Sequence, residues 1–200
     1  MMNLKELFQM QRQLDQHIEE KHPRENGEDR LAKKILALQV ELGELANEQR
    51  SWKFWSRDQK PRVKVLVEPD ERNPNAFKNP LLEEYVDCLH FILSIGLEEY
   101  EYRVLDEVAM LPVNRIINFE PIKYESITKQ FNYLFNQVGY FYDCTADHEF
   151  GESSEVEEQY EFIYRMFIGL GEMLGFTQEQ IEEAYMEKNA TNYARQENGY

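Results

Sequence analysis

Apolar residues recur every three or four positions along most of the chain, a spacing typical of amphipathic helices. The first such stretch begins at Asn3 and ends before His22-Pro23. The second runs from about Glu28 to Arg50, after a turn at Asn26-Gly27. The apolar faces of these two predicted helices consist of Leu4, Leu7, Phe8, Leu14 and Ile18 in the first and Leu31, Ile35, Leu38, Leu42 and Leu45 in the second.

A third helix is predicted to begin at Asn79-Pro80, with Asn79 as N-cap and Pro80 at the first helical position. This helix is apolar almost all round, from Leu81 through Leu97. A helix without a polar face has to be covered by others on most sides. We therefore expect it to lie at the centre of the molecule.

Three further helices are expected towards the C-terminus. One spans about Glu125 to Cys144. The next begins at a capping box, Ser154 to Glu157, and ends at Gly175, and the last begins at a second capping box, Thr177 to Gln180, and runs to about Gln196. The pattern predicts an all-α fold, a helical bundle of about six main helices forming a single domain over residues 1–200.

Two segments have no regular pattern. Residues 56–79 are polar and contain prolines, which predicts a long loop with a short extended piece at Val63 to Val67. Residues 101–124 contain Pro112 and Pro121 and are expected to form an irregular connection.

The formal net charge is −16, which argues against a polynucleotide partner because phosphates would be repelled. A small anionic substrate is still possible if a divalent cation supplies positive charge. No stretch approaches the roughly 18 apolar residues of a membrane span, and the N-terminus has no apolar signal region. Cys88 and Cys144 are expected to be buried, reduced thiols. These features together predict a cytoplasmic protein with no membrane partner.

Paired carboxylates are the clearest candidates for chemistry. Glu41 and Glu44 lie three residues apart at the edge of the apolar face of the second helix, and Glu84 and Asp87 have the same spacing in the third. His90 follows Asp87 by three residues. Burying an unpaired carboxylate in an apolar helix costs several kcal/mol unless a cation or strong donors meet it. The two pairs therefore indicate a metal site.

The type of ligand selects the metal. Oxygen-only sites suit Mg²⁺, with Mn²⁺ as a possible substitute, whereas zinc would require His or Cys. Mg²⁺ sites are commonly completed by substrate phosphates. Two other interpretations are weaker. A di-iron bundle needs two Glu-x-x-His motifs, but only Asp87-x-x-His90 is present, and His148-Glu149 falls in an expected loop. A solvated acidic surface would account for one pair of carboxylates, but it accounts less well for two pairs, one of them inside an apolar helix.

The pattern of Glu41-x-x-Glu44 and Glu84-x-x-Asp87 resembles the metal motif of the all-α NTP pyrophosphohydrolases, the superfamily of the MazG-like enzymes and the dimeric dUTPases. Further stretches resemble the dUTPase branch. They are Gln11-Arg-Gln13-Leu-Asp-Gln-His17, Trp52-Lys53-Phe-Trp55, Asp87-x-x-His90-Phe91 and Lys188-Asn189-x-x-Asn192-x-x-Arg195-Gln196-x-x-Gly199-Tyr200.

The resemblance implies Mg²⁺-dependent hydrolysis of dUTP, and often of dUDP, to dUMP on a helical homodimer. The four acids Glu41, Glu44, Glu84 and Asp87 would hold the metal, and Glu41 would be the general base for the attacking water. The remaining implied residues would contact the substrate: Gln13 and His17 near the base, Trp55 and His90 around the nucleoside, Lys188, Asn192 and Arg195 at the phosphates or sugar, and Lys53 at a part of the substrate that the resemblance does not specify.

The spacing of Lys188, Asn192 and Arg195 supports this role independently, because residues at i, i+4 and i+7 share one helical face. A salt-bridged helix end would give the same pattern, and Trp52 and Trp55 could equally be core residues. Two alternative functions remain open. One is an enzyme of the same scaffold acting on dCTP or other nucleotides, and the other is a non-catalytic helical interaction module.

Overall fold

The computed structural model describes residues 3–66, 77–101, 120–146 and 154–199. Within these residues the chain is almost entirely helical, which confirms the expected all-α bundle. The helices are α1 (Leu4–Lys21), α2 (Arg30–Gln49), α3 (Pro80–Glu101), α5 (Ile127–Ala146), α6 (Ser154–Leu174) and α7 (Gln178–Glu197).

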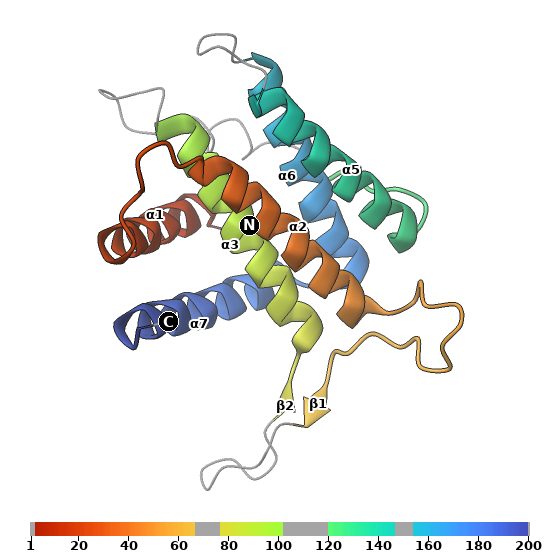
Figure 1. Ribbon diagram of the computed structural model, residues 1–200. Helices are drawn as coiled ribbons and strands as arrows, with labels where there is room; N and C mark the ends of the chain where they lie inside the picture. The colour runs from red at the N-terminus through yellow and green to blue at the C-terminus, as the bar shows by residue number, and fades with distance from the viewer. Residues whose placement is uncertain (1–2, 67–76, 102–119, 147–153, 200) are drawn as a thin grey trace, which may run out of the picture.

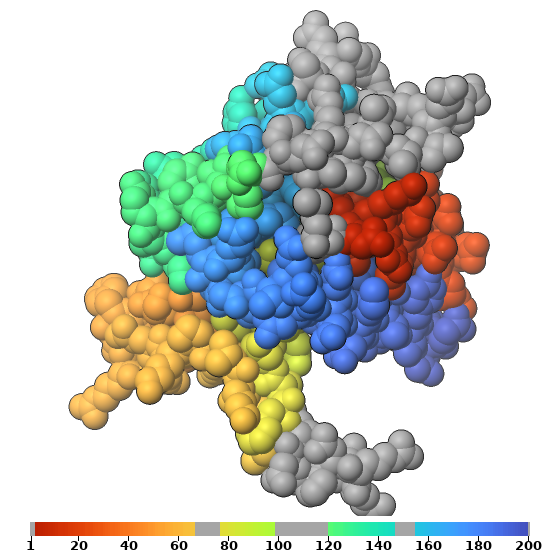
Figure 2. All heavy atoms as spheres, turned by 180° about the vertical axis from the view of Figure 1, so that it is seen from behind, coloured from red at the N-terminus to blue at the C-terminus, as the bar shows by residue number. Residues whose placement is uncertain are grey.

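Helix α3 is the centre of the arrangement, as its apolar composition predicts. It packs along α2 over most of its length and also contacts α1, α6 and α7 (Figure 1). Helices α1 and α7 lie side by side on one flank of α3, where they form a continuous surface (Figure 2). Helices α5 and α6 form an antiparallel pair on the other flank (Figure 1).

The core lies around α3. Its residues Tyr85, Val86, Leu89 and Leu93 have no exposed surface, and fully burying a large apolar side chain contributes about 1.5–3 kcal/mol relative to leaving it exposed. The Tyr85 ring stacks on Phe167 of α6, with the ring centroids 4.3 Å apart. Cys88 and Cys144 are buried free thiols, as expected.

Local sequence explains where most helices begin and end. The Asp29 side chain accepts a hydrogen bond from the Ala32 amide at 2.8 Å, so α2 begins at Arg30, two residues after the expected start at Glu28. The expected capping box of α7 is present, with Thr177 and Gln180 exchanging hydrogen bonds. Gly175 has φ +84° and ends α6, as expected.

Helix α6 is described from Ser154, the residue at which it was expected to begin. The capping box expected from Ser154 to Glu157 stays a prediction, because the residues before Ser154 lie outside the described part of the chain. The fourth expected helix, from about Glu125 to Cys144, corresponds to α5 and is shifted by two residues, to Ile127–Ala146.

The segment between α2 and α3 projects from the bundle (Figure 1). It contains a short antiparallel pair, β1 (Val65–Leu66) and β2 (Phe77–Lys78), in which Val65 faces Lys78 and Leu66 faces Phe77. The expected extended piece is therefore present at residues 65–66, and β2 was not expected. Of the irregular connection expected at 101–124, residue 101 still belongs to α3, and residues 102–119 lie outside the described part. Among the described helices, none is long and apolar enough to cross a membrane.

Candidate active site

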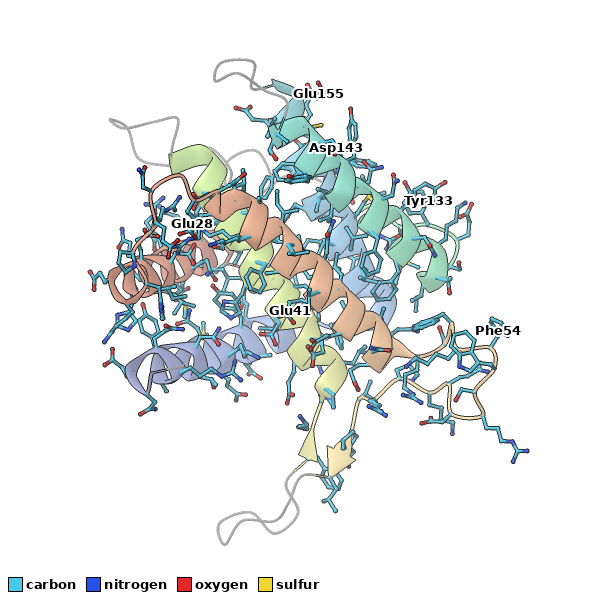
Figure 3. All side chains as sticks on the ribbon, viewed as in Figure 1. Glu28, Glu41, Phe54, Tyr133, Asp143 and Glu155 are labelled. Carbon is cyan, nitrogen blue, oxygen red and sulfur yellow. The ribbon has the colours of Figure 1, made fainter. Side chains whose placement is uncertain are left out.

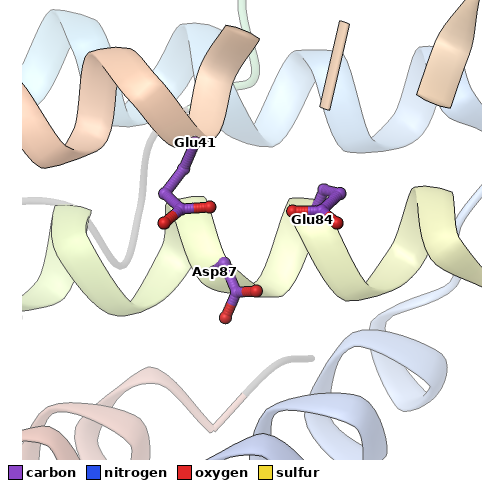
Figure 4. A group of neighbouring side chains, drawn as sticks. All are labelled: Glu41, Glu84 and Asp87. Carbon is purple, nitrogen blue, oxygen red and sulfur yellow. The ribbon is translucent and has the colours of Figure 1, made fainter. Parts of the chain in front are cut away.

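Three carboxylates from two helices meet between α2 and α3. Glu41 extends from α2 toward α3, which contributes Glu84 and Asp87 one turn apart on a single face (Figure 4). Each offers one carboxylate oxygen, and these oxygens all lie within 4.8 Å of one another. Glu41 sits near the middle of the packed helices, far from the projecting segment that carries Phe54 (Figure 3). Helix packing therefore creates a cluster of acids that are distant in sequence.

The electrostatics of this cluster are unfavourable without a cation. Burial raises the pKa of Glu41 to about 7, and the charges of Asp87 and Glu44 add to that increase. Burial likewise raises the pKa of Glu84 to about 7, with further contributions from Asp87, Glu44 and Glu41. Carboxylates that raise one another's pKa are being held together against repulsion. A divalent cation would relieve that repulsion.

Lys188 of α7 reaches the cluster from the other side. Its Nζ lies 2.5 Å from Asp87 Oδ2 in a partly buried ion pair. Burial raises the pKa of Asp87, while the hydrogen bond and the charge of Lys188 act in the opposite direction. Arg195, also on α7, lowers the pKa values of Glu41 and Asp87 through its charge. The site therefore combines carboxylates from α2 and α3 with cations from α7.

A cavity of about 690 Å³ opens beside the cluster, which is within the range of small-molecule sites. It is bounded by α1, α2, α3 and α7. The lining includes carboxylates, cations, an amide and an imidazole, supplied by Glu41, Asp87, Lys188, Arg195, Asn192 and His90. Such a lining can receive a molecule with both a charged and a polar neutral part.

Farther along the cavity a hydrogen-bonded network surrounds His90. Gln11 Oε1 lies 2.7 Å from His90 Nδ1 and accepts a hydrogen bond from the Tyr185 hydroxyl at 2.8 Å. Gln11 Nε2 donates to Asp15 at 2.7 Å. The His90 ring stacks on Tyr185 with centroids 4.1 Å apart. Burial lowers the pKa of His90 to about 3, so the imidazole is neutral at physiological pH.

A family model described as dUTPase matches residues 3–69 and 71–200 of the chain. The chain belongs to the dimeric, all-α dUTPase family. Members of this family are dUTP diphosphatases, so this chain is an enzyme. A comparison with curated proteins found no match. The resemblance noted from the sequence motifs is therefore confirmed over nearly the whole chain.

Among the residues that the dUTPase resemblance implicates, one group lies at the cavity and the acid cluster. Its members are Glu41, Glu84, Asp87, His90, Lys188, Asn192 and Arg195. Glu44 is exposed and lies outside the three-residue cluster, although its charge raises the pKa values of Glu41 and Glu84. Its position is that of a rim residue next to the cluster.

Two α1 residues that the dUTPase resemblance places near the base lie elsewhere within this chain. Gln13 is exposed and does not line the cavity. His17 Nε2 lies 2.9 Å from the Glu197 carboxylate, and its ring is 5.1 Å from Tyr193. Gln11, two residues before Gln13 and therefore on nearly the opposite side of α1, lines the cavity instead.

Lys53 and Trp55 lie in the turn that follows α2, away from the cavity. Trp55 is 64% exposed and contacts Trp52 and Phe54 edge to face. Trp52 is 36% exposed and donates its indole N–H to the Ala46 carbonyl at 2.8 Å. Lys53 lies over the Trp52 ring. The alternative that these tryptophans are core residues is therefore wrong, and the turn presents aromatic rings at the surface.

Sequence reasoning gave no individual role to Gln11, Asp15 or Ser94, although Gln11 and Asp15 lie in the stretch that resembles the dUTPases. One signal for Gln11 was present: it continues the apolar stripe Leu4, Leu7, Leu14 at helical spacing, and a polar residue in such a stripe is buried and needs partners. Asp15 and Ser94 have no such signal, because their meeting depends on how α1 packs against α3.

Proposed function

We propose that the chain hydrolyses dUTP, and also dUDP, to dUMP with a divalent cation held by Glu41, Glu84 and Asp87. The observation that carries this proposal is the cluster of three carboxylates facing Lys188 at one end of the cavity. The oxygen-only donor set fits Mg²⁺, with Mn²⁺ as a substitute. Glu44, which lies beside the cluster, would join the other three carboxylates as a ligand of the cation when the substrate is bound.

A bound cation would supply charge neutralisation for the phosphates and for the attacking water. The residues of the chain provide the rest. Glu41 belongs to the carboxylate cluster and lines the cavity, so its carboxylate would lie beside a water held at the cation and could accept a proton from it. Glu41 is therefore the proposed general base.

The cations of α7 would bind the phosphates. Lys188, Asn192 and Arg195 all line the cavity, and together they provide two positive charges and one amide. Phosphoryl chemistry depends mainly on positioning and charge neutralisation. An acidic chain with net charge −16 needs such a local positive surface to retain a triphosphate.

The nucleoside would lie about one helical turn further along α3, next to His90 and Gln11. Lys53, Trp55, Gln13 and His17 lie outside the cavity within one chain, so any contact with substrate would require movement of their segments or a second copy. We also propose a homodimer, on the basis of family membership. Exposed apolar side chains on α2, Leu36 at 61% and Val40 at 52%, support an interface there.

The test is product formation from equimolar dUTP, dCTP, dTTP and UTP, with Mg²⁺ and with EDTA. We expect dUMP and pyrophosphate from dUTP, with loss of activity in EDTA. Turnover of another nucleotide in place of dUTP would still support a cation-dependent hydrolase, but it would contradict the proposal that uracil is the recognised base. If EDTA has no effect, the carboxylate cluster is not a metal site.

A non-catalytic interaction module is the alternative from a different class. In that case none of the nucleotides would be consumed, and Mg²⁺ with a non-hydrolysable dUTP analogue would leave the melting temperature unchanged. An enzyme that binds both should be stabilised by mass action.

A further inference from the structure

Asp15 lies in the second half of α1 and connects three helices through hydrogen bonds. Its Oδ1 accepts from Gln11 Nε2 at 2.7 Å, and its Oδ2 accepts from the Ser94 hydroxyl of α3 at 2.6 Å. Lys34 of α2 lies 3.4 Å from Oδ2. Each neighbour is a donor, which matches an ionised carboxylate, a group that only accepts.

The Asp15 carboxylate determines which way the Gln11 amide points. A side-chain amide has a donating end and an accepting end. Only the NH₂ group can face a carboxylate, so the amide oxygen must face the opposite way, toward Tyr185 and His90. Gln11 is 3% exposed, and a buried amide in the reversed orientation would set two acceptors against each other.

The Gln11 oxygen in turn determines the tautomer of His90. That oxygen can only accept, so His90 Nδ1 must carry the proton in their 2.7 Å contact. In a neutral imidazole the other nitrogen then has a lone pair and no proton. His90 Nε2 is buried and has no hydrogen-bond partner among the described residues, and His90 lines the cavity. A buried acceptor without a partner is costly unless a ligand satisfies it.

We propose that Asp15 is a positioning residue for base specificity, which fixes the Gln11 amide and thereby keeps His90 Nε2 as a hydrogen-bond acceptor toward the nucleobase. A ring nitrogen that carries hydrogen, such as the imide N–H of uracil, satisfies this acceptor. The corresponding ring nitrogen of cytosine has a lone pair and would oppose it. The identity of the ligand rests on the proposed function, whereas the tautomer of His90 does not.

The isosteric substitution Asp15→Asn reverses this chain of hydrogen bonds. Lys34 can only donate, so the new amide turns its oxygen to Lys34 and Ser94 and its NH₂ to Gln11. Gln11 then presents its oxygen to residue 15 and its NH₂ to Tyr185 and His90. His90 Nδ1 becomes the acceptor, and the proton moves to Nε2. The site would now donate where it previously accepted.

Two measurements test this proposal. Nitrogen-15 NMR of the histidine side chains, without nucleotide, reports which ring nitrogen carries the proton. We expect Nδ1–H for His90 in the wild type and Nε2–H in Asp15→Asn. Steady-state kinetics with dUTP and dCTP should show the ratio of their kcat/KM values falling roughly 10- to 100-fold in Asp15→Asn, with KM for dUTP rising more than kcat falls.

Two further variants serve as controls. Glu20→Gln makes the same chemical change at an exposed position of α1 and should leave both the tautomer and the nucleotide ratio unchanged. Asp15→Glu restores a carboxylate and should recover part of the dUTP preference. Circular dichroism establishes that each variant is folded, and the wild-type NMR result stands even if Asp15→Asn does not fold.

Several outcomes would overturn the inference. One is a wild-type His90 protonated at Nε2. Another is an Asp15→Asn variant that loses activity on both nucleotides equally with its tautomer unchanged, which would make Asp15 structural only. If the wild type hydrolyses neither nucleotide, the proposed function fails, and the tautomer change still decides whether Asp15 positions His90.

Discussion

At the scale of single residues, the site is dominated by the cost of placing like charges together. Glu41 and Glu84 each have a pKa of about 7, raised mainly by burial. Lys188 offsets this for Asp87 through a direct ion pair, whereas it lowers the pKa values of Glu41 and Glu84 only through its charge. The cluster therefore costs the free protein stability, and a ligand that brings positive charge would reduce that cost.

The substitution Glu41→Gln tests both the contribution of Glu41 to catalysis and its cost to the stability of the free protein. We expect kcat for dUTP to fall about 10²- to 10⁴-fold, because a general base is lost and the cation site is weakened. Glu187→Gln is the matched control, since Glu187 is exposed and precedes Lys188 on α7. Full activity in Glu41→Gln would remove Glu41 from the mechanism.

The same variant should be more stable than the wild type in EDTA above neutral pH. Glu41 has an ordinary pKa of 4.5 and a folded pKa of about 7, so the folded state holds the extra proton between these values. Stability is therefore lost as pH rises from about 4.5 to 7. Partial solvent screening reduces the effect to about 1–2 kcal/mol at pH 8. Denaturant unfolding at pH 5 and pH 8 measures it, and an equal difference at both pH values would contradict this account.

At the scale of elements, the site depends on how closely the helices approach α3. Gly171 of α6 packs against the Tyr85 hydroxyl of α3, and a Cβ at residue 171 would overlap it. The Tyr85 ring cannot easily move away, because it is fully buried and stacked on Phe167. Since Tyr85 lies between Glu84 and Asp87 in the chain, the α3–α6 contact also helps to fix the orientation of the two acids.

Gly171→Ala is therefore expected to destabilise the protein by about 1–3 kcal/mol, the usual cost of overpacking a core. Gly139→Ala in α5 is the matched control, because the nearest atom to a Cβ there is Gln39 Nε2 at 4.0 Å. That variant should gain about 0.5–1 kcal/mol, because alanine is the better helix former. Thermal or denaturant unfolding compares the two, and a similar change in both would show that the contact with Tyr85 is unimportant.

At the scale of the whole molecule, net charge and exposed apolar surface act in opposite directions. The charge of −16 repels a second copy of the chain, whereas Leu36 and Val40 expose apolar side chains one turn apart on α2. A stable interface has to bury enough apolar surface to overcome that repulsion. Salt screens the charges beyond about 8 Å at physiological ionic strength and should favour association.

We expect light scattering at physiological salt to give about twice the monomer mass of 24.0 kDa, with more monomer at low salt. Leu36→Glu should shift the equilibrium toward monomer. Met186→Glu on α7 is the control, because it introduces the same charge at another partly exposed apolar position. A wild-type monomer at all salt concentrations would contradict the proposed homodimer. If the two variants behave alike, α2 is not the interface.

The helices and the central place of α3 could be predicted from the residues alone, because both follow from local spacing. Leu31 to Leu45 define one face of α2, and a helix as apolar as α3 has to be covered by others. The pairs Glu41/Glu44 and Glu84/Asp87 also indicated the acid site, since burying such groups has a recognisable cost.

Which of these residues meet depends on how the helices pack against one another. Glu41 meets Glu84 and Asp87, whereas Glu44 is exposed beside the cluster, because the rotation of α2 turns only one of its two acids toward α3. Helix packing also joins Gln11 to His90, and Asp15 to Ser94, residues 79 positions apart in each case. Contacts across such separations depend on the packing of α1 against α3, and no local pattern in either helix specifies them.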